Sequence, residues 1–168
     1  MSTGATAIAA GDYHTCALKG GGVKCWGANN HGQLGDGTTA SHGAPTLVSN
    51  LPSGVAAVAA GGGYTGGEHT CALLLGGAVQ CRGDNAQGKL GDGTTTDRAT
   101  PTQVACLMSG VTAVALGAYH GCALSLDGGV SCWGDNMEGE LGAPTTTTSR
   151  CASTGSACGL TPIPVHDL

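Results

Sequence analysis

The sequence predicts an all-β protein made of three propeller-type blades, each with four strands. One observation behind this prediction is a stretch of two cysteines, glycines and "GxNxxGxLG" that occurs three times in the same order. The other is that no window of about ten or more residues has a helical period. Four short strands in each unit of about 50 residues are typical of a propeller blade. Because three blades do not close a ring, we expect other copies to complete them into a ring or an open fibre.

The repeat divides the whole chain into three consecutive units, 1–51, 52–107 and 108–168. Each unit opens on a segment of alternating small apolar residues and closes on a segment led by proline. The opening strands are expected at 5–11, 55–61 and 111–117, and the closing strands at 45–51, 101–107 and 162–168. The chain starts and stops at the same phase of the repeat, so the tail of one copy can dock on the head of the next.

Between these two segments, each unit contains a β-hairpin. In the first unit, "HTCAL" and "VKCWG" are joined by Lys19 and three glycines, which supply positive φ angles where a tight turn needs them. Folding this hairpin about its centre places Cys16 opposite Cys25. The same construction places Cys71 opposite Cys81 and Cys122 opposite Cys132. A proline-led fourth strand suits the edge of a sheet, where the missing N–H is tolerated.

The opposed cysteines indicate a disulfide framework. Each hairpin link would contribute about 2–3 kcal/mol by the chain-entropy model, which is useful in a chain with no phenylalanine and 32 glycines. The alternative is that the thiols stay reduced and pack as small apolar groups. We expect disulfides, and therefore an extracellular or cell-surface location, although the N-terminus lacks the pattern of a signal peptide.

Three cysteines lie outside the hairpins and leave two connectivities open. Cys151 and Cys158 flank an insertion confined to the third unit and can close it locally, which leaves Cys106 unpaired. Alternatively, Cys106 bonds to one of them and ties the second unit to the third. An odd number of cysteines leaves one thiol for an intermolecular bond, or free, in either arrangement.

Composition argues against several classes of partner. The net charge is −5 with six scattered Lys and Arg residues, so no basic face can follow a phosphate backbone. The same scarcity disfavours anionic membranes, and no apolar run approaches the roughly 20 residues of a membrane span. We therefore expect neither a nucleic-acid partner nor membrane insertion.

No residue pattern in the sequence indicates catalysis, a metal or a cofactor. His14 and Cys16 are neighbours on one strand with nothing to orient the imidazole, and the cysteine intervals do not suit zinc. Asp92 and Asp97 lie in a glycine-rich turn without the ligand spacing of a calcium loop. We expect the repeated histidines to make local hydrogen bonds and the repeated asparagines to form turns. The framework positions are His14, His69, His120, Asn29, Asn85, Asn136, Trp26 and Trp133.

These motifs resemble the regulator-of-chromosome-condensation repeat in its cysteine-containing bacterial form. The resemblance covers essentially the whole chain as three copies, and it is carried by the motifs H-T-C-A-L, C-W-G-x-N and G-Q-L-G-D-G-T. The resemblance implies a β-propeller, commonly seven-bladed, whose loops bind other proteins; family members include a nucleotide-exchange factor, an ultraviolet receptor and a β-lactamase inhibitor. This sequence departs from the pattern at Arg82, which replaces a tryptophan, at Gly121, which replaces a threonine, and at 142–145.

We therefore expect a non-enzymatic, extracellular structural protein that associates with itself end to end, as a six-blade dimer or a filament. One alternative is a protein-binding propeller module of the inhibitor or surface-recognition type, which would use its rim loops. Another is that the chain is an excerpt of a longer propeller.

Overall fold

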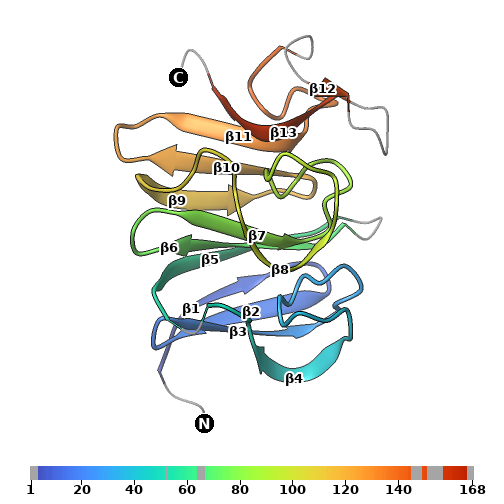
Figure 1. Cartoon of the computed structure of the whole chain (residues 1–168), viewed down its shortest axis with the longest axis vertical. Coiled ribbons are helices and arrows are strands. Elements are labelled where there is room, and N and C mark those ends of the chain that lie inside the picture. The colour runs from blue at the N-terminus through green and yellow to red at the C-terminus, as the bar shows by residue number, and fades with distance from the viewer. Residues whose placement is uncertain (1–3, 52, 64–66, 145–148, 151–156, 166–168) are drawn as a thin grey trace.

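The computed structural model describes residues 4–51, 53–63, 67–144, 149–150 and 157–165 as three stacked antiparallel β-sheets (Figure 1). We call these sheets, with their loops, blades 1, 2 and 3. Blade 1 contains β1 (Ala5–Ala10), β2 (His14–Lys19), β3 (Gly22–Gly27) and β4 (His42–Leu47). Blade 2 contains β5 (Val55–Gly61), β6 (His69–Leu74), β7 (Val79–Gly83) and β8 (Arg98–Gln103). Blade 3 contains β9 (Val111–Leu116), β10 (His120–Ser125), β11 (Val130–Asp135), β12 (Ser149–Arg150) and β13 (Ala157–Pro164).

All regular elements in the described ranges are strands, which confirms the predicted all-β class with three blades. None of the described residues lies in a helix that could cross a membrane. Neighbouring strands within blades 1 and 2 follow chain order, as expected for blades built from consecutive hairpins. Blade 3 adds the two-residue β12 at the free edge of β13.

The hairpin register follows from a short turn. Cys16 lies directly opposite Cys25, and Lys19 pairs with Gly22. Gly20 and Gly21 then form the two-residue connection, with φ angles of 59° and 77°. Positive φ at both central positions matches the twist of the flanking strands, which explains why the first turn is made of glycine.

The fourth strands differ from the prediction in their bounds. We expected β4 and β8 to begin at Pro45 and Pro101, but they begin three residues earlier, at His42 and Arg98. Each proline therefore lies inside its strand. The strand is at the edge of its sheet, and its register shifts opposite the last residues of β3 or β7, so the missing N–H is accommodated. The expected closing strand of the third unit is also displaced, since β13 ends at Pro164.

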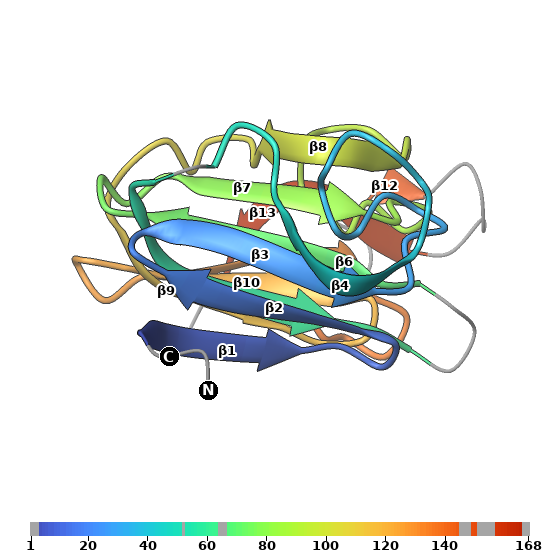
Figure 2. The same cartoon turned by 90° about the horizontal axis from the view of Figure 1, so that it is seen from below.

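The blades are stacked in chain order, and β5 contacts both β1 and β9 (Figures 1 and 2). Each junction between blades has its own apolar core. Cys16 and Leu18 of blade 1 pack with Ala72 of blade 2, and Leu73 of blade 2 packs with Trp133 of blade 3. The two cores consequently lie between sheets, and each blade is stabilised mainly by its neighbours.

Candidate functional site

Consecutive blades are joined by side chains that are buried in, and hydrogen-bonded to, the neighbouring blade. The residue that follows the second hairpin cysteine inserts into the preceding blade at both internal junctions, where it is Arg82 or Trp133. We call these two residues, and Trp26 at the same position of blade 1, the wedge residues. Trp133 is fully buried in a cluster with Cys71 and Cys81 of blade 2. Its indole N–H donates a 2.9 Å hydrogen bond to the carbonyl oxygen of Lys89. The wedge therefore combines apolar packing with one directional bond across the junction.

Arg82 takes the same place between blades 1 and 2. Its Nε donates to the carbonyl oxygen of Gln33 at 3.2 Å, as Trp133 does to Lys89. Its Nη2 lies 3.2 Å from Sγ of Cys25, and Nη1 is buried without a hydrogen-bond partner among the described residues. Burial lowers the pKa of Arg82 to about 9. Arginine thus reproduces the hydrogen bond of the tryptophan but brings an unpaired charge into the core.

A glycine in the preceding blade leaves room for each wedge residue. A Cβ atom at Gly91 would lie 2.8 Å from Cδ1 of Trp133, and one at Gly35 would collide with Cδ of Arg82. Both glycines are buried and have positive φ. The "GxLG" motif is therefore the acceptor of the wedge from the next blade.

We expect Arg82→Met to leave the free energy of unfolding unchanged or raise it by about 1–3 kcal/mol, because an apolar side chain of similar length removes a buried unpaired charge. Arg98→Met is the matched control. Arg98 pairs with the buried carboxylate of Asp92 at 2.8 Å, so its loss should lower the free energy of unfolding by about 1–3 kcal/mol. Urea denaturation measures both, and a marked loss of stability in the Arg82 variant would contradict the expectation.

His14 makes a second contact between blades 1 and 2. Its Nδ1 lies 3.0 Å from Oε2 of Glu68, and its Nε2 lies 2.7 Å from Oγ1 of Thr70. Glu68 also accepts from the side chain of Gln33 and from the backbone N–H of Tyr13. Burial alone would raise the pKa of Glu68, but its hydrogen bonds with His14 and Gln33 hold it below the ordinary value. The expected local hydrogen bond was wrong here, because both partners of His14 belong to the next blade.

His69 occupies the same position in blade 2 but has no such partners. Tyr119 and Gly121 stand where Glu68 and Thr70 stand at the other junction. His69 is fully buried, and no side chain in the described part of the chain hydrogen-bonds to either ring nitrogen. Burial, reinforced by the charge of Lys89, lowers the pKa of His69 to about 3. A small residue is needed at Gly121, since a Cβ there would lie 2.8 Å from the ring of Trp133.

Thr70, His14 and Glu68 have the connectivity of a nucleophile, a base and an orienting carboxylate. The Thr70 hydroxyl, however, donates to the carbonyl oxygen of Gln33 at 2.9 Å, so it accepts from His14 and does not give up its proton. The three side chains are buried between two sheets. The geometry therefore serves to join blades and leaves no access for a substrate.

A pocket of about 210 Å³ on the loop side is lined by residues of all three blades. His31, Asp84 and Asp97 place one ligand atom each within 4.8 Å of one another, a grouping that the sequence analysis missed because the residues are far apart in the chain. Lys89, however, forms an ion pair with Asp84 and lies over the ring of Tyr119, 4.9 Å from its centroid. The ammonium group already compensates the buried carboxylate, which disfavours a cation at this position.

The framework asparagines hold the long loops between the third and fourth strands. The Asn29 side chain accepts from the N–H of Leu34 and donates to the carbonyl oxygens of Thr38 and Ala40. Asn85 repeats these contacts, and Asn136 accepts from the N–H of Leu141. These loops carry the "GxLG" acceptors, so the asparagines position the wedge sites.

The structure contains the three hairpin disulfides. They join Cys16 to Cys25, Cys71 to Cys81 and Cys122 to Cys132. Cys158 is also disulfide-bonded, whereas Cys106 is an exposed free thiol. A link from Cys106 to either of the other two is therefore absent, and Cys151 lies outside the described residues.

The outer faces of blades 1 and 3 expose groups that are covered at the internal junctions. Leu124 of blade 3 is 41% exposed, while Leu18 and Leu73 at the same position are 4% and 5% exposed. On the opposite end, Ile8 is 72% exposed and the wedge residue Trp26 is only partly buried. A small apolar hollow of about 150 Å³ marks the outer face of blade 3.

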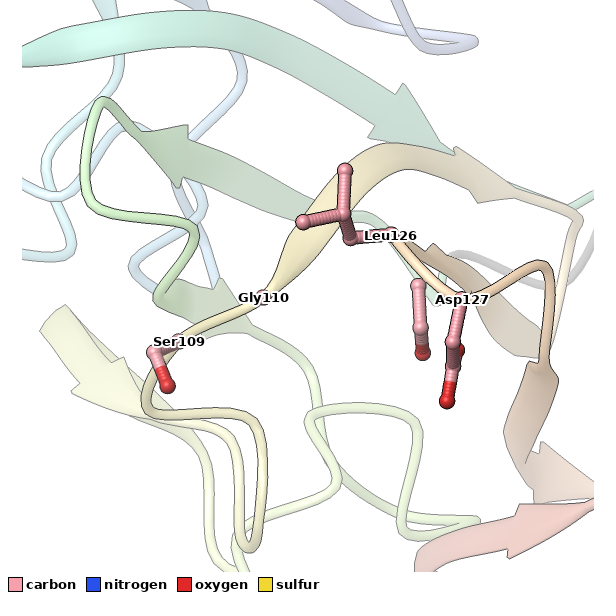
Figure 3. Close-up of a pocket in the computed structure, with 5 residues that line it drawn as sticks. Ser109, Gly110, Leu126 and Asp127 are labelled. Carbon is pink, nitrogen blue, oxygen red and sulfur yellow. The ribbon is translucent and has the colours of Figure 1, made fainter.

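A second exposed apolar surface lies on the rim formed by the hairpin turns. Leu75, Met108 and Leu126 are all strongly exposed. Leu126 borders an open hollow of about 590 Å³, together with Gly110 and Asp127 (Figure 3).

Known proteins share both the sequence and the fold. The regulator of chromosome condensation (RCC1) repeat matches residues 21–73 and 77–124, and a second form of the same repeat matches 5–33 and 111–140.

Two relatives illustrate the similarity. The X-linked retinitis pigmentosa GTPase regulator of Canis lupus familiaris is 34% identical over 145 residues, which are 84% of this chain and 14% of the relative. The ultraviolet-B receptor of Arabidopsis thaliana is 34% identical over 145 residues, or 84% of this chain and 32% of the relative. The chain thus spans about a seventh to a third of these relatives.

Among solved structures, yeast RCC1 bound to Kap60 superposes with a TM-score of 0.79 at 21% identity, over 98% of this chain and 38% of that one. At this identity the match concerns the fold alone. Human WBSCR16 superposes with a TM-score of 0.70 at 25% identity, over 95% of this chain and 38% of that one. The chain belongs to the regulator of chromosome condensation (RCC1) repeat family.

Proposed function

We propose that this chain is a protein-binding propeller segment that associates end to end with further copies of itself. The observation that carries the proposal is the difference in exposure of equivalent residues. Leu124 is open where Leu18 and Leu73 are covered, and Trp26 is partly open where Trp133 is fully buried. The expected partner of each outer face is a second copy of this chain, because each outer face has the residues of one half of an internal junction.

The same proposal assigns a structural, non-enzymatic role in an oxidising, extracellular setting. The hydrogen-bonded set of Thr70, His14 and Glu68 is sealed between blades, which supports a structural use. Three hairpin disulfides are compatible with an oxidising compartment. A head-to-tail contact forms a six-blade dimer if the rotation closes and a filament if it does not.

Light scattering across a range of protein concentrations tests this association. Twice the chain mass of 16.2 kDa indicates the six-blade dimer, and a large polydisperse mass indicates the filament. The Cys106→Ser variant should give the same mass as the native chain, because blade stacking does not need the free thiol. Monomer at every concentration would contradict self-association and favour the excerpt interpretation.

A second candidate function is recognition of another protein through the hairpin rim. The exposed Leu75, Met108 and Leu126 and the hollow beside Leu126 favour it. The relative of known structure, yeast RCC1, was solved in a complex with Kap60, which supports partner binding by this fold. Leu126→Asp separates the two functions, since it alters the rim and should leave end-to-end association intact.

A further inference from the structure

We infer that Trp26 is the wedge residue of an intermolecular junction, in which its indole N–H donates to the Glu140 carbonyl oxygen of a second copy. This inference rests on the proposed end-to-end association and names the residues that carry it. Trp26 follows Cys25 as Trp133 follows Cys132. Among the described residues, no hydrogen bond is made by the Trp26 indole, and the side chain is only partly buried.

The acceptor is identified by the internal junctions. Arg82 donates to the carbonyl of Gln33 and Trp133 to the carbonyl of Lys89, and both acceptors stand two residues before a "GxLG" glycine. Glu140 is the equivalent residue of blade 3. No donor from the described part of the chain reaches its carbonyl oxygen, so this acceptor is available.

The space for the wedge is also present in blade 3. Cβ atoms at Gly35 and Gly91 would each meet a valine of their own blade and the wedge residue of the next. A Cβ at Gly142 would meet the side chain of Val165, but no wedge residue. Gly142 is exposed, whereas Gly35 and Gly91 are buried. Gly142 therefore has the valine contact but lacks the contact with a wedge residue. At Gly91 the corresponding space is filled by Trp133.

The docking that places Trp26 on Glu140 also predicts a second contact, between a histidine and a threonine. At the first junction, His14 Nε2 lies 2.7 Å from the hydroxyl oxygen of Thr70. Blade 1 has Thr15 at the position of Thr70, and blade 3 has the half-exposed His120 at the position of His14. The same docking that places Trp26 on Glu140 places Thr15 beside His120 of the second copy. The intermolecular junction then has both a tryptophan wedge and a histidine–threonine bond, a combination that neither internal junction has.

The experiment compares the native chain with Trp26→Ala and Leu124→Glu by analytical ultracentrifugation. We expect each variant to weaken self-association at least tenfold, because one loses the wedge and the other places a charge on the accepting face. Trp26→Phe should fall between the native chain and Trp26→Ala, since it retains a ring but not the N–H donor. Urea denaturation of diluted protein checks that each variant remains folded.

Mixing the two variants is the decisive control. Trp26→Ala retains the accepting face, and Leu124→Glu retains the wedge, so an equimolar mixture should form a 1:1 complex that grows no further. If the native chain associates and Trp26→Ala associates equally well, the inference is wrong and end-to-end association remains. If the variants weaken but the mixture stays monomeric, the two residues do not face each other and the inference is also wrong. A monomeric native chain would overturn the association itself.

Discussion

Replacing Trp133 with alanine should lower the free energy of unfolding by about 3–5 kcal/mol. Trp133 is among the largest fully buried side chains, and it joins blade 3 to the core of blade 2. The substitution removes this packing and leaves the Lys89 carbonyl without its donor. Because the two cores lie between blades, the loss also reduces the coupling of blade 3 to the rest of the stack.

Trp26→Ala is the matched control for this prediction. It removes the same side chain at the same position of blade 1, where the indole is only partly buried and makes no hydrogen bond within the described chain. In protein diluted enough to prevent association, its cost should be well below that of Trp133→Ala. The chain has two tryptophans, so each variant keeps one fluorescent reporter of urea unfolding. Equal losses in the two variants would contradict the wedge role of Trp133.

The fold could be predicted from the sequence because its determinants are local. The alternating strands, the glycine turn after Lys19 and the opposed Cys16 and Cys25 all lie within one hairpin or its neighbours. Period-two alternation fixes which side chains share a face, so the hairpin register follows directly from the cysteine spacing. The bounds of the fourth strands were less predictable, because Pro45 marks an edge strand but not its first residue.

The junction contacts could not be derived in the same way, because their partners lie far apart in the chain. His14 meets Glu68 across 54 residues, and nothing in the first unit specifies that partner. A comparison of equivalent positions in the three units does indicate that Glu68 has a special role. Glu68 stands where the other units have tyrosine, and a buried carboxylate requires donors such as His14 and Gln33. Arg82 departs visibly from the repeat pattern in the sequence, but its wedge role depends on the stacking of blades 1 and 2.

The absence of such partners at His69 has a measurable consequence for stability in mild acid. The unfolded chain protonates His69 at its ordinary pKa of 6.5, whereas the folded chain keeps it neutral until the pH approaches about 3. Below pH 6.5 the unfolded state therefore binds more protons, and the free energy of unfolding falls by up to about 1.4 kcal/mol per pH unit. Between pH 6.5 and about 5, the expected loss is about 2 kcal/mol.

This window separates the histidine from the carboxylates whose pKa values are lowered, whereas burial raises the pKa of Asp135, so a histidine variant is needed to assign the effect. The folded-state pKa values of Glu68, Asp84 and Asp92 are lowered, so the stability that they contribute is present above their ordinary values near 4 and is lost only at lower pH. His69→Leu removes the group that must stay neutral and should flatten the dependence of unfolding free energy on pH between 6.5 and about 5. His120→Leu changes the half-exposed counterpart, retains His69 and should keep the steep dependence. A native chain whose urea midpoint does not change across this window would contradict the prediction. It would show that a proton acceptor or solvent reaches His69 in the folded state.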